Sequence, residues 1–479
     1  MRRLLPRPLK APLRWLSGRL PPLWRQSATV RRTARFIRQS EGWSEARLRA
    51  HQLARLQEIV RHASAHVPGY RQKFLAHGVD PAAIRSLADL PGLPCLTKDD
   101  LRAAPERYVA DNIPRERLQL VVSGGTTGTP TGFYHIAGYN DDVARAFRLA
   151  MWSRLGHTPA SRALDLTASF APDRLRFAAD ARTLWVSIGA LDPGQFPSIA
   201  DTIRRFDPEF VIGFPSTATL LAQLLRETPV PALRVRGVIT ASEVMHEAQR
   251  RYIAEGFRCR ILEWYGLAEY AGFAAGCASS DAYHFFPQAG TLELLDEADR
   301  PVTREGDEGE IVLTGFYNWA TPFIRYRTGD RAALGRGHCE ACGRHYPLVE
   351  RIAGRTQEFL VARTGRLVPG SALNVHSDLF HHVWTYQMRQ DTPGEVDLCM
   401  VRKPSYAPAQ TEVIRREMQD KLGPDMVLRI HFVEAIPRTP RGKHQFIAQT
   451  LPRPESGRHP SVEGDHASSS AREAKGARP

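Results

Sequence analysis

Apolar residues recur at helical spacing in the first regular stretch of the chain. Between residues 45 and 66 they fall on one side of a helix: Leu48, Leu53, Leu56, Ile59 and Val60. Pro68 and Gly69 interrupt this pattern, and a short amphipathic segment follows over residues 70–79. Thr97 is a residue type that caps helices, so we expect a helix over residues 98–103.

Further along the chain, short apolar strands alternate with helical segments. Strand patterns cover residues 210–214, 236–240 and 259–266, and helical patterns cover residues 199–206, 217–227 and 245–255. This alternation is typical of a parallel, doubly wound sheet, in which ligands bind at the carboxyl ends of the strands. We therefore expect the loops over residues 123–132, 240–243 and 265–269 to lie at that edge. We also expect Ser216 to cap the helix over residues 217–227.

After residue 290 the pattern changes to that of antiparallel strands. Residues 291–302 are typical of a hairpin, and residues 310–316 of a strand. Residues 359–452 mix strands and a helix, as a compact α+β module does. From residue 454 onward the chain contains one apolar residue larger than alanine, and we expect this tail to be disordered.

These patterns predict an α/β fold, with a large multi-layer N-terminal domain containing parallel sheets and a small α+β C-terminal domain. We assign residues 41–354 to the large domain and residues 355–452 to the small one. Residues 1–40 are expected to form a basic arm, and residues 453–479 a disordered tail. A chain of 479 residues that is 42% apolar is long enough for two such cores.

The positive charge is concentrated at the N-terminus. The formal net charge is +14, yet residues 1–40 hold eleven Lys and Arg and no acidic residue, which leaves 54 basic against 51 acidic residues elsewhere. A nearly neutral body argues against specific nucleic-acid binding. Prolines prevent a continuous helix in the arm, which either is solvated or rests on an anionic membrane surface through Trp15 and Trp24.

Two further features concern the cellular location. No apolar run approaches the roughly 18 residues of a membrane span. Six cysteines in a chain of this size do not make a disulfide framework. The sequence therefore predicts a cytoplasmic protein, with peripheral membrane contact through the arm left open.

The run SGGTTGTPTG, from Ser123 to Gly132, is the strongest chemical signal. Small residues after an apolar strand expose backbone N–H groups, and the threonines add hydroxyls; both suit the oxygens of a polyphosphate. The run is not a Walker loop, because Thr129 stands where that motif has lysine. A glycine-rich turn without chemical importance is the alternative.

Five motifs in order make the chain resemble the adenylate-forming, acyl-CoA synthetase superfamily. They are SGGTTGTP (123–130), YGLAE (265–269), NWATPFIRYRTGD (318–330), ERIAGRTQEFL (350–360) and PRTPRGK (437–443), with HVPGYR (66–71) as a further match. Within the superfamily the chain is most similar to the phenylacetate–CoA ligase-like family, in its branch associated with capsular polysaccharide biosynthesis. The resemblance leaves out only the basic arm and the tail.

The resemblance implies ATP-dependent activation of a carboxylic acid to an acyl-adenylate, with release of pyrophosphate, by two domains of which the small one is mobile. It implies a nucleotide site made of Ser123, Gly124, Gly125, Thr126, Thr127, Gly128, Thr129, Ser242, Glu243, Tyr265, Gly266, Glu269, Asp330, Arg355 and Lys443. Thr127, Glu269 and Lys443 are its catalytic residues. Glu269 would bind Mg²⁺, Asp330 the ribose hydroxyls, and Lys443 would bridge the carboxylate and the α-phosphate.

The acyl group would then pass to coenzyme A or to another acceptor. One departure from the family bears on this step, because Gln357 stands where many relatives have an aspartate pivot for domain rotation. We expect the acyl pocket to lie at residues 210–215 and 271–275. The identity of the acid and the existence of a homodimer are left open.

A metal site is indicated by the pair Cys339 and Cys342, which a glycine follows. The other two ligands would be Cys277 and His284, a set that resembles one in the family, while His338 is a competing fourth ligand. Such a Cys3His site would be a structural zinc site beside the active centre, with no position open for catalysis.

Two other functions compete with the ligase. One is a nucleotide-binding accessory protein of polysaccharide assembly that has lost catalysis, which Gln357 and the basic arm favour. The other is a zinc-ribbon nucleic-acid binder, which the nearly neutral body disfavours.

Overall fold

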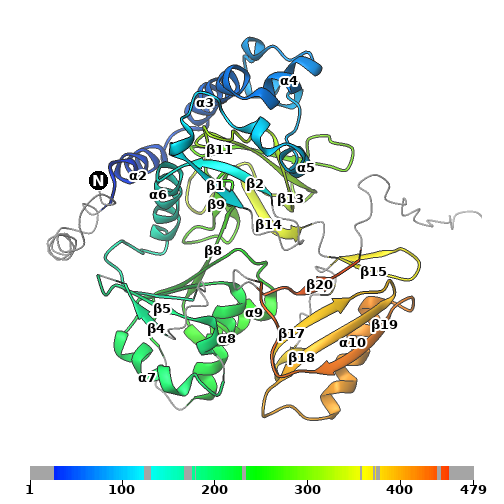
Figure 1. Cartoon of the computed structure of the whole chain (residues 1–479). Coiled ribbons are helices and arrows are strands. Elements are labelled where there is room, and N and C mark those ends of the chain that lie inside the picture. The colour runs from blue at the N-terminus through cyan, green and yellow to red at the C-terminus, as the bar shows by residue number, and fades with distance from the viewer. Residues whose placement is uncertain are drawn as a thin grey trace, which may run out of the picture.

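The computed structural model describes residues 26–122, 131–166, 175–178, 180–191, 193–228, 233–355, 359–369, 373, 378–439 and 444–451. Figure 1 shows a large domain that contains most of the helices and a smaller domain that contains β17, β18, β19 and α10. This arrangement confirms the predicted α/β class with a small α+β C-terminal domain. No helix of the described part of the chain is both long and apolar enough to cross a membrane.

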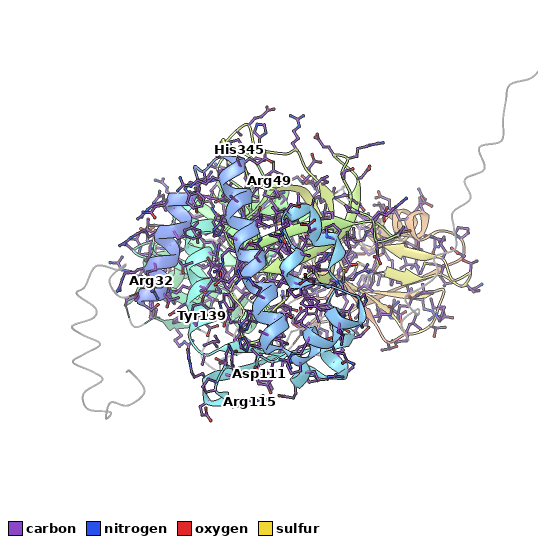
Figure 2. All side chains as sticks on the ribbon, turned by 90° about the horizontal axis from the view of Figure 1, so that it is seen from above. Arg32, Arg49, Asp111, Arg115, Tyr139 and His345 are labelled. Carbon is purple, nitrogen blue, oxygen red and sulfur yellow. The ribbon has the colours of Figure 1, made fainter. Side chains whose placement is uncertain are left out.

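Nine α-helices are described. They are α2 (Ala28–Ser40), α3 (Glu45–His66), α4 (Pro68–Ala76), α5 (Lys98–Ala103), α6 (Tyr139–Ser153), α7 (Pro197–Phe206), α8 (Pro215–Glu227), α9 (Glu247–Phe257) and α10 (Ala409–Leu422). Helix α3 has the predicted bounds, and Thr97 caps α5 by accepting a hydrogen bond from the amide of Asp100. Figure 2 shows Arg32 and Arg49 on the outer surface of α2 and α3, where both are exposed.

The prediction that residues 1–40 form one unfolded basic arm is wrong for its last part. Residues 28–40 form α2, which packs against α6. Val30 and Ile37 are buried in a core with Phe147, while the arginines between them face the solvent. This amphipathic helix was not predicted from the sequence, because each turn of its buried face contributes only one apolar residue among many basic ones. Residues 1–25 lie outside the described part.

A twelve-stranded sheet runs through the large domain, in the order β11-β12-β13-β14-β10-β9-β8-β7-β6-β3-β5-β4. Its strands are β3 (Ala163–Asp165), β4 (Leu175–Phe177), β5 (Thr183–Val186), β6 (Phe210–Gly213), β7 (Gly237–Ala241), β8 (Arg260–Gly266), β9 (Phe273–Ala275), β10 (Tyr283–Phe285), β11 (Gly290–Leu295), β12 (Glu308–Gly315), β13 (Tyr326–Leu334) and β14 (Leu348–Arg355). Strands β8, β7 and β6 are parallel, as predicted, and β3 and β5, which were not predicted from the sequence, continue the parallel part. The others pair antiparallel.

The parallel strands are buried on both faces, which explains their continuous apolar sequences. On β7, Val238 enters a core with helices α7, α8 and α9, whereas Ile239 enters the opposite core with α2 and α6. Val211 and Ile212 alternate in the same way on β6. Period-two alternation therefore assigns successive residues to two different hydrophobic layers.

The glycine-rich segment does not follow a strand of this sheet, contrary to the prediction. Strand β1 (Leu118–Val122) pairs antiparallel with β2 (Gly132–Ile136) in a separate ribbon. Residues 123–130 connect the two strands and lie outside the described part. An apolar strand followed by glycines is equally compatible with a hairpin, so the sequence pattern alone did not distinguish the two arrangements.

The small domain is built on a four-stranded sheet in the order β19-β18-β17-β20. Its strands are β17 (Val383–Gln390), β18 (Glu395–Arg402), β19 (Val427–Phe432) and β20 (Ile447–Gln449), and β15 (Phe359–Val361) and β16 (Leu367–Pro369) form a hairpin beside them. Ile414, Met418 and Leu422 of α10 are buried against this sheet. The exact domain boundary near residue 355 stays a prediction.

We expect the substitution Ile37→Ala to reduce the free energy of unfolding by about 2–5 kcal/mol, because it removes a buried side chain from the α2–α6 packing. The exposed neighbour Arg35 provides the control, and Arg35→Ala should change stability by less than about 0.5 kcal/mol. Urea denaturation measures both variants. Equal effects of the two substitutions would show that α2 is not packed in solution.

Candidate active site

The hairpin that carries the glycine-rich loop is fixed to two other motifs. The amide of Tyr134 in β2 donates a hydrogen bond to Thr321 Oγ1 at 3.1 Å, and Thr321 belongs to the NWATPFIRYRTGD segment. His135, also in β2, stacks on Tyr270, with ring centroids 4.8 Å apart. Tyr270 directly follows the YGLAE segment. Three motifs that are far apart in sequence therefore lie side by side.

Glu269, the last residue of YGLAE, is held by a phenol. Tyr326 in β13 donates a hydrogen bond from its hydroxyl to Glu269 Oε1 at 2.7 Å. Glu269 is 5% exposed, so this bond and the narrow access fix the carboxylate in position. A buried carboxylate oxygen is a hard ligand of the type that Mg²⁺ prefers.

Asp330 is also held by a phenol, which belongs to the first residue of the YGLAE segment. Tyr265, at the end of β8, donates a hydrogen bond to Asp330 Oδ2 at 2.7 Å. The backbone of Arg355 in β14 pairs directly with that of Asp330 in β13, which brings the predicted pair onto neighbouring strands. The side chain of Arg355 is not described.

One face of β13 organises both carboxylates. Tyr326, Thr328 and Asp330 are the buried positions of an alternating pattern, so their side chains share one face. Tyr326 and Asp330 are four residues apart, or about 13 Å along a strand. Tyr265 reaches Asp330 from the end of β8, and Glu269 reaches Tyr326 from the segment that follows β8. The structure thus places two phenol–carboxylate pairs along one strand.

The TASE loop carries Ser242 and Glu243, two of the residues predicted for the nucleotide site. Ser242 has φ +71°, a left-handed conformation that is uncommon for residues with a Cβ and that recurs at functional sites. Glu243 points to helix α8, where its carboxylate accepts hydrogen bonds from the amide of Ser216 at 3.0 Å and from its hydroxyl at 3.1 Å. The carboxylate of Glu243 is thus engaged in these hydrogen bonds, and the nucleotide-binding role of Ser242 and Glu243 stays a prediction.

The prediction that Ser216 caps its helix is therefore wrong. Helix α8 begins at Pro215, two residues before the predicted start, and proline is a residue type favoured in the first turn. The Ser216 hydroxyl instead contacts Glu243 and accepts a hydrogen bond from Arg438 of the small domain at 2.9 Å. The residue serves the contact between the domains.

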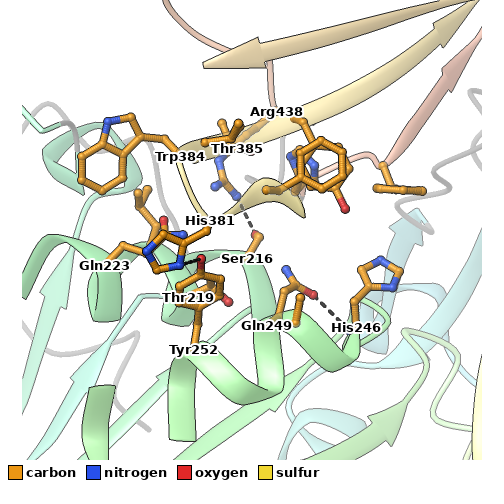
Figure 3. Close-up of a pocket in the computed structure, with 17 residues that line it drawn as sticks. Ser216, Thr219, Gln223, His246, Gln249, Tyr252, His381, Trp384, Thr385 and Arg438 are labelled. Carbon is orange, nitrogen blue, oxygen red and sulfur yellow. Dashed lines mark hydrogen bonds between the residues drawn. The ribbon is translucent and has the colours of Figure 1, made fainter. Parts of the chain in front are cut away.

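The two domains enclose a cavity of about 90 Å³ (Figure 3). Helices α8 and α9 supply one wall, and β17 with the segment around Phe446 supplies the other. Tyr252 of α9 and His381 of the small domain form a hydrogen bond of 2.8 Å across it. At one end the amide of His444 donates a hydrogen bond to Glu243 at 2.6 Å, and burial raises the pKa of this carboxylate.

The expected acyl pocket at residues 271–275 stays a prediction; Ala271, Gly272 and Phe273 line a small cavity there. These residues are all buried, and Ala271, Phe273, Ala274 and Ala275 belong to the core clusters beneath the sheet. Small side chains there allow the close approach of neighbouring strands, since a Cβ on Gly272 would meet Leu313 at 2.9 Å. The other expected segment, residues 210–215, does not line the interdomain cavity. The adjacent Ser216 does.

The four predicted metal ligands meet in one cluster. The ligand atoms of Cys277, His284, Cys339 and Cys342 all lie within 4.8 Å of one another. His284 Nδ1 lies 2.7 Å from the carbonyl oxygen of Ala282, which fixes the proton on that nitrogen and leaves Nε2 facing Cys342 Sγ at 3.4 Å. Gly343 has φ +68°, as the turn after the second cysteine requires.

This donor set fits a tetrahedral soft-ligand metal such as Zn²⁺. The cluster joins the β9–β10 turn to the loop between β13 and β14, at the opposite end of β9 from Glu269. It therefore acts on the hairpins that carry the site rather than directly beside Glu269. His338, the competing ligand, does not belong to this cluster.

Several predicted site residues lie outside the described part of the chain. They are Ser123, Gly124, Gly125, Thr126, Thr127, Gly128, Thr129, Gln357 and Lys443. Their roles stay predictions.

The sequence of this chain is similar to those of known proteins over most of its length. The phenylacetate–coenzyme A ligase of Escherichia coli (strain K12) is 30% identical over 378 residues, which cover 74% of this chain and 82% of that protein. The chain belongs to the phenylacetate–CoA ligase family. It is therefore an adenylate-forming ligase. The family model of the CapK C-terminal domain matches residues 360–450, and Protein CapK of Staphylococcus aureus is 20% identical over 383 residues, 76% of this chain and 81% of that protein.

Solved structures agree on the fold. A 2-hydroxyisobutyryl-CoA ligase in the postadenylation state has a TM-score of 0.69 at 22% identity, and covers 86% of this chain and 91% of its own. The same ligase in the thioesterification state has a TM-score of 0.58 at 22% identity. Both likenesses confirm the two-domain architecture of this family member.

Sequence reasoning missed the residues that hold the site together. Tyr326 lies within a quoted motif, and its alternation with Asp330 was a readable signal. Arg438 also lies in a quoted motif, but its contact with Ser216 depends on how the domains meet, which no local pattern encodes. Nothing in the sequence indicated the stacking of His135 on Tyr270.

We expect His135 to make stability depend on pH. Burial lowers the pKa of His135 from 6.5 to about 4, so below pH 6.5 the unfolded chain binds a proton that the folded chain excludes until about pH 4. Stability is therefore lost as the pH falls through this window. His135→Phe keeps a ring against Tyr270 without the titrating group. Between pH 7 and pH 5 the variant should lose about 1–2 kcal/mol less than the native protein in urea denaturation, and an identical loss would contradict the prediction.

Proposed function

We propose that this ligase activates a carboxylic acid with ATP and then transfers the acyl group to the thiol of coenzyme A. A carboxylate oxygen forms a bond to the α-phosphorus, and pyrophosphate leaves. A thiol then attacks the acyl carbonyl carbon, and AMP leaves. The observation that carries the proposal is the pair of phenol-held carboxylates, Glu269 and Asp330, on one face of β13 beside the glycine-rich hairpin.

Two anions must meet in the first step, so the site has to neutralise charge and orient both reactants. Asp330 would accept hydrogen bonds from the ribose hydroxyls, which fixes the nucleotide at one end. Glu269 would hold Mg²⁺ at the phosphates, and the metal would supply charge neutralisation there. The glycine-rich loop, with Thr127, would donate hydrogen bonds to the phosphate oxygens.

Lys443 would supply the cation between the two anions. The described residue that follows it, His444, donates its amide to Glu243 of the TASE loop. This contact supports the assignment, because it attaches the PRTPRGK segment to the large domain on the side of the predicted nucleotide site. Arg438 of the same segment is attached there as well, through Ser216.

We further propose that the activated acid belongs to capsular or extracellular polysaccharide biosynthesis. The match of residues 360–450 to the CapK C-terminal domain and the likeness to Protein CapK support this role. A catalytically impaired accessory protein is less consistent with the structure, since Glu269 and Asp330 are both present and held by dedicated hydrogen bonds.

ATP–pyrophosphate exchange with a panel of aryl, fatty, hydroxy and amino acids tests the first step. We expect exchange that depends on one class of acid, and a loss of at least about 100-fold in Lys443→Ala, because a charge at the developing transition state is removed. The matched control is Lys421→Ala, on α10 of the same domain. Absence of exchange across the panel, with the Lys443 variant indistinguishable from the native protein, would favour the accessory role.

The Cys3His cluster is proposed to be a structural zinc site. Its four donors are complete, so no position is left for a substrate. Bound zinc would tie the β9–β10 turn to the β13–β14 loop and so support both strands that bear site residues.

Elemental analysis of protein purified without added metal should find about one zinc per chain, and less than about 0.2 would defeat the site. Cys339→Ser should reduce the zinc content to near zero and lower the thermal midpoint. Cys95→Ser, at a partly buried cysteine outside the cluster, should leave the zinc content unchanged.

A further inference from the structure

A half-buried arginine lies beside the Cys3His cluster. Arg154 follows the last residue of α6, and its Nη1 donates hydrogen bonds to the carbonyl oxygens of Ala275 at 2.8 Å and Gly276 at 2.9 Å. These carbonyls immediately precede Cys277. The guanidinium lies over the ring of Phe286, with its central carbon 4.6 Å from the ring centroid. Arg154 is close enough to interact electrostatically with His284 and Cys342.

This guanidinium is incompletely satisfied. Its Nε and Nη2 atoms are inaccessible to solvent and have no hydrogen-bond partner among the residues that the structure describes. Within the described ranges Arg154 also makes no ion pair. The nearby charged residues Arg344 and Glu41 pair with each other instead. An unpaired buried cation costs several kcal/mol, so it persists in proteins when an anion compensates it.

The local charge count identifies the missing anion. Arg344 is paired with Glu41 at 3.2 Å, and Arg260 with Asp281 at 2.7 Å. Arg250 also contacts Asp281, at 3.1 Å, and is paired with Glu263. These three arginines and three carboxylates cancel, which leaves the single positive charge of Arg154. Three thiolates and one neutral imidazole around a divalent cation carry one net negative charge. A cluster that holds the divalent ion with all three sulfurs deprotonated balances this count.

We propose that Arg154 is the charge-compensating positioning residue of the metal cluster, selecting a divalent cation bound by three thiolates. The inference rests on the proposed zinc site and deepens it. Arg154 does not contact the metal. It acts through the cluster's net charge and through the two carbonyls that orient the loop bearing Cys277.

The proposal predicts opposite effects of one substitution in two states of the protein. In the zinc-loaded protein, Arg154→Gln removes the counter-charge of an anionic cluster, so the thermal midpoint should fall. In protein stripped with a chelator, the same substitution removes an uncompensated buried cation, so the midpoint should rise or stay unchanged. Glutamine retains an N–H donor for the carbonyl of Ala275, which limits the loss of hydrogen bonding.

Zinc affinity provides the second measurement, by competition with a chromophoric chelator. Arg154→Gln should weaken binding by about 10- to 100-fold, as loss of an outer partner of a metal site does. Arg154→Lys, which keeps the charge, should stay within about threefold of the native protein. The control is Arg260→Gln, because Arg260 donates to the carbonyl oxygen of Cys277 at 3.4 Å but its charge is already paired with Asp281.

The outcomes distinguish a failure of the proposed zinc site from a failure of the role proposed for Arg154. Native protein without zinc overturns the zinc site itself. Native protein with zinc, and Arg154→Gln with equal losses of thermal midpoint in both states and unchanged affinity, assigns Arg154 a packing role only. Equal weakening by Arg260→Gln likewise overturns the proposal. If Arg154→Gln does not fold, the Arg154→Lys affinity decides, because a large loss there excludes compensation by charge.

Discussion

The alternation of side chains along β13 is the constraint on which the site depends. Tyr326 and Asp330 share a face because the strand has a period of two, and each takes part in one phenol–carboxylate pair. A shift of one residue in the pairing of β13 would turn both side chains into the opposite layer. The register with β12 and β14 is therefore a condition for the nucleotide site as well as for the core.

The flanking strands show how this register is kept. β13 pairs with β12 on one side and β14 on the other, with local shifts between residues 331 and 332 and between 333 and 334. Bulges of this kind re-aim side chains next to functional sites. Gly329, with φ +77°, precedes Asp330 and donates its amide to Glu310 of β12. The sequence Thr328-Gly329-Asp330 is also typical of a turn, yet in this protein it lies inside a strand.

Much of the fold could be predicted from the sequence, and the failures share one cause. Helix α3 and the parallel strands β6, β7 and β8 follow from local periodicity, and the cysteine cluster follows from spacing and residue type. Ser216 and the residues of α2 were misassigned because their roles are set by partners distant in the chain, Glu243 and α6. Local patterns specify an element, whereas its partners are specified by the tertiary structure.

A comparison of two arginines shows what compensation means in this protein. Arg325 is 6% exposed, and its Nε and Nη2 donate to both oxygens of Glu293 at 3.0 and 2.9 Å, while its Nη1 donates to the carbonyls of Pro91 and Leu93. Each nitrogen of that guanidinium donates to an acceptor, and the carboxylate of Glu293 compensates its charge. Arg154 has two carbonyls and no carboxylate. The counter-charge that Glu293 supplies to Arg325 would be supplied to Arg154 by the proposed anionic cluster.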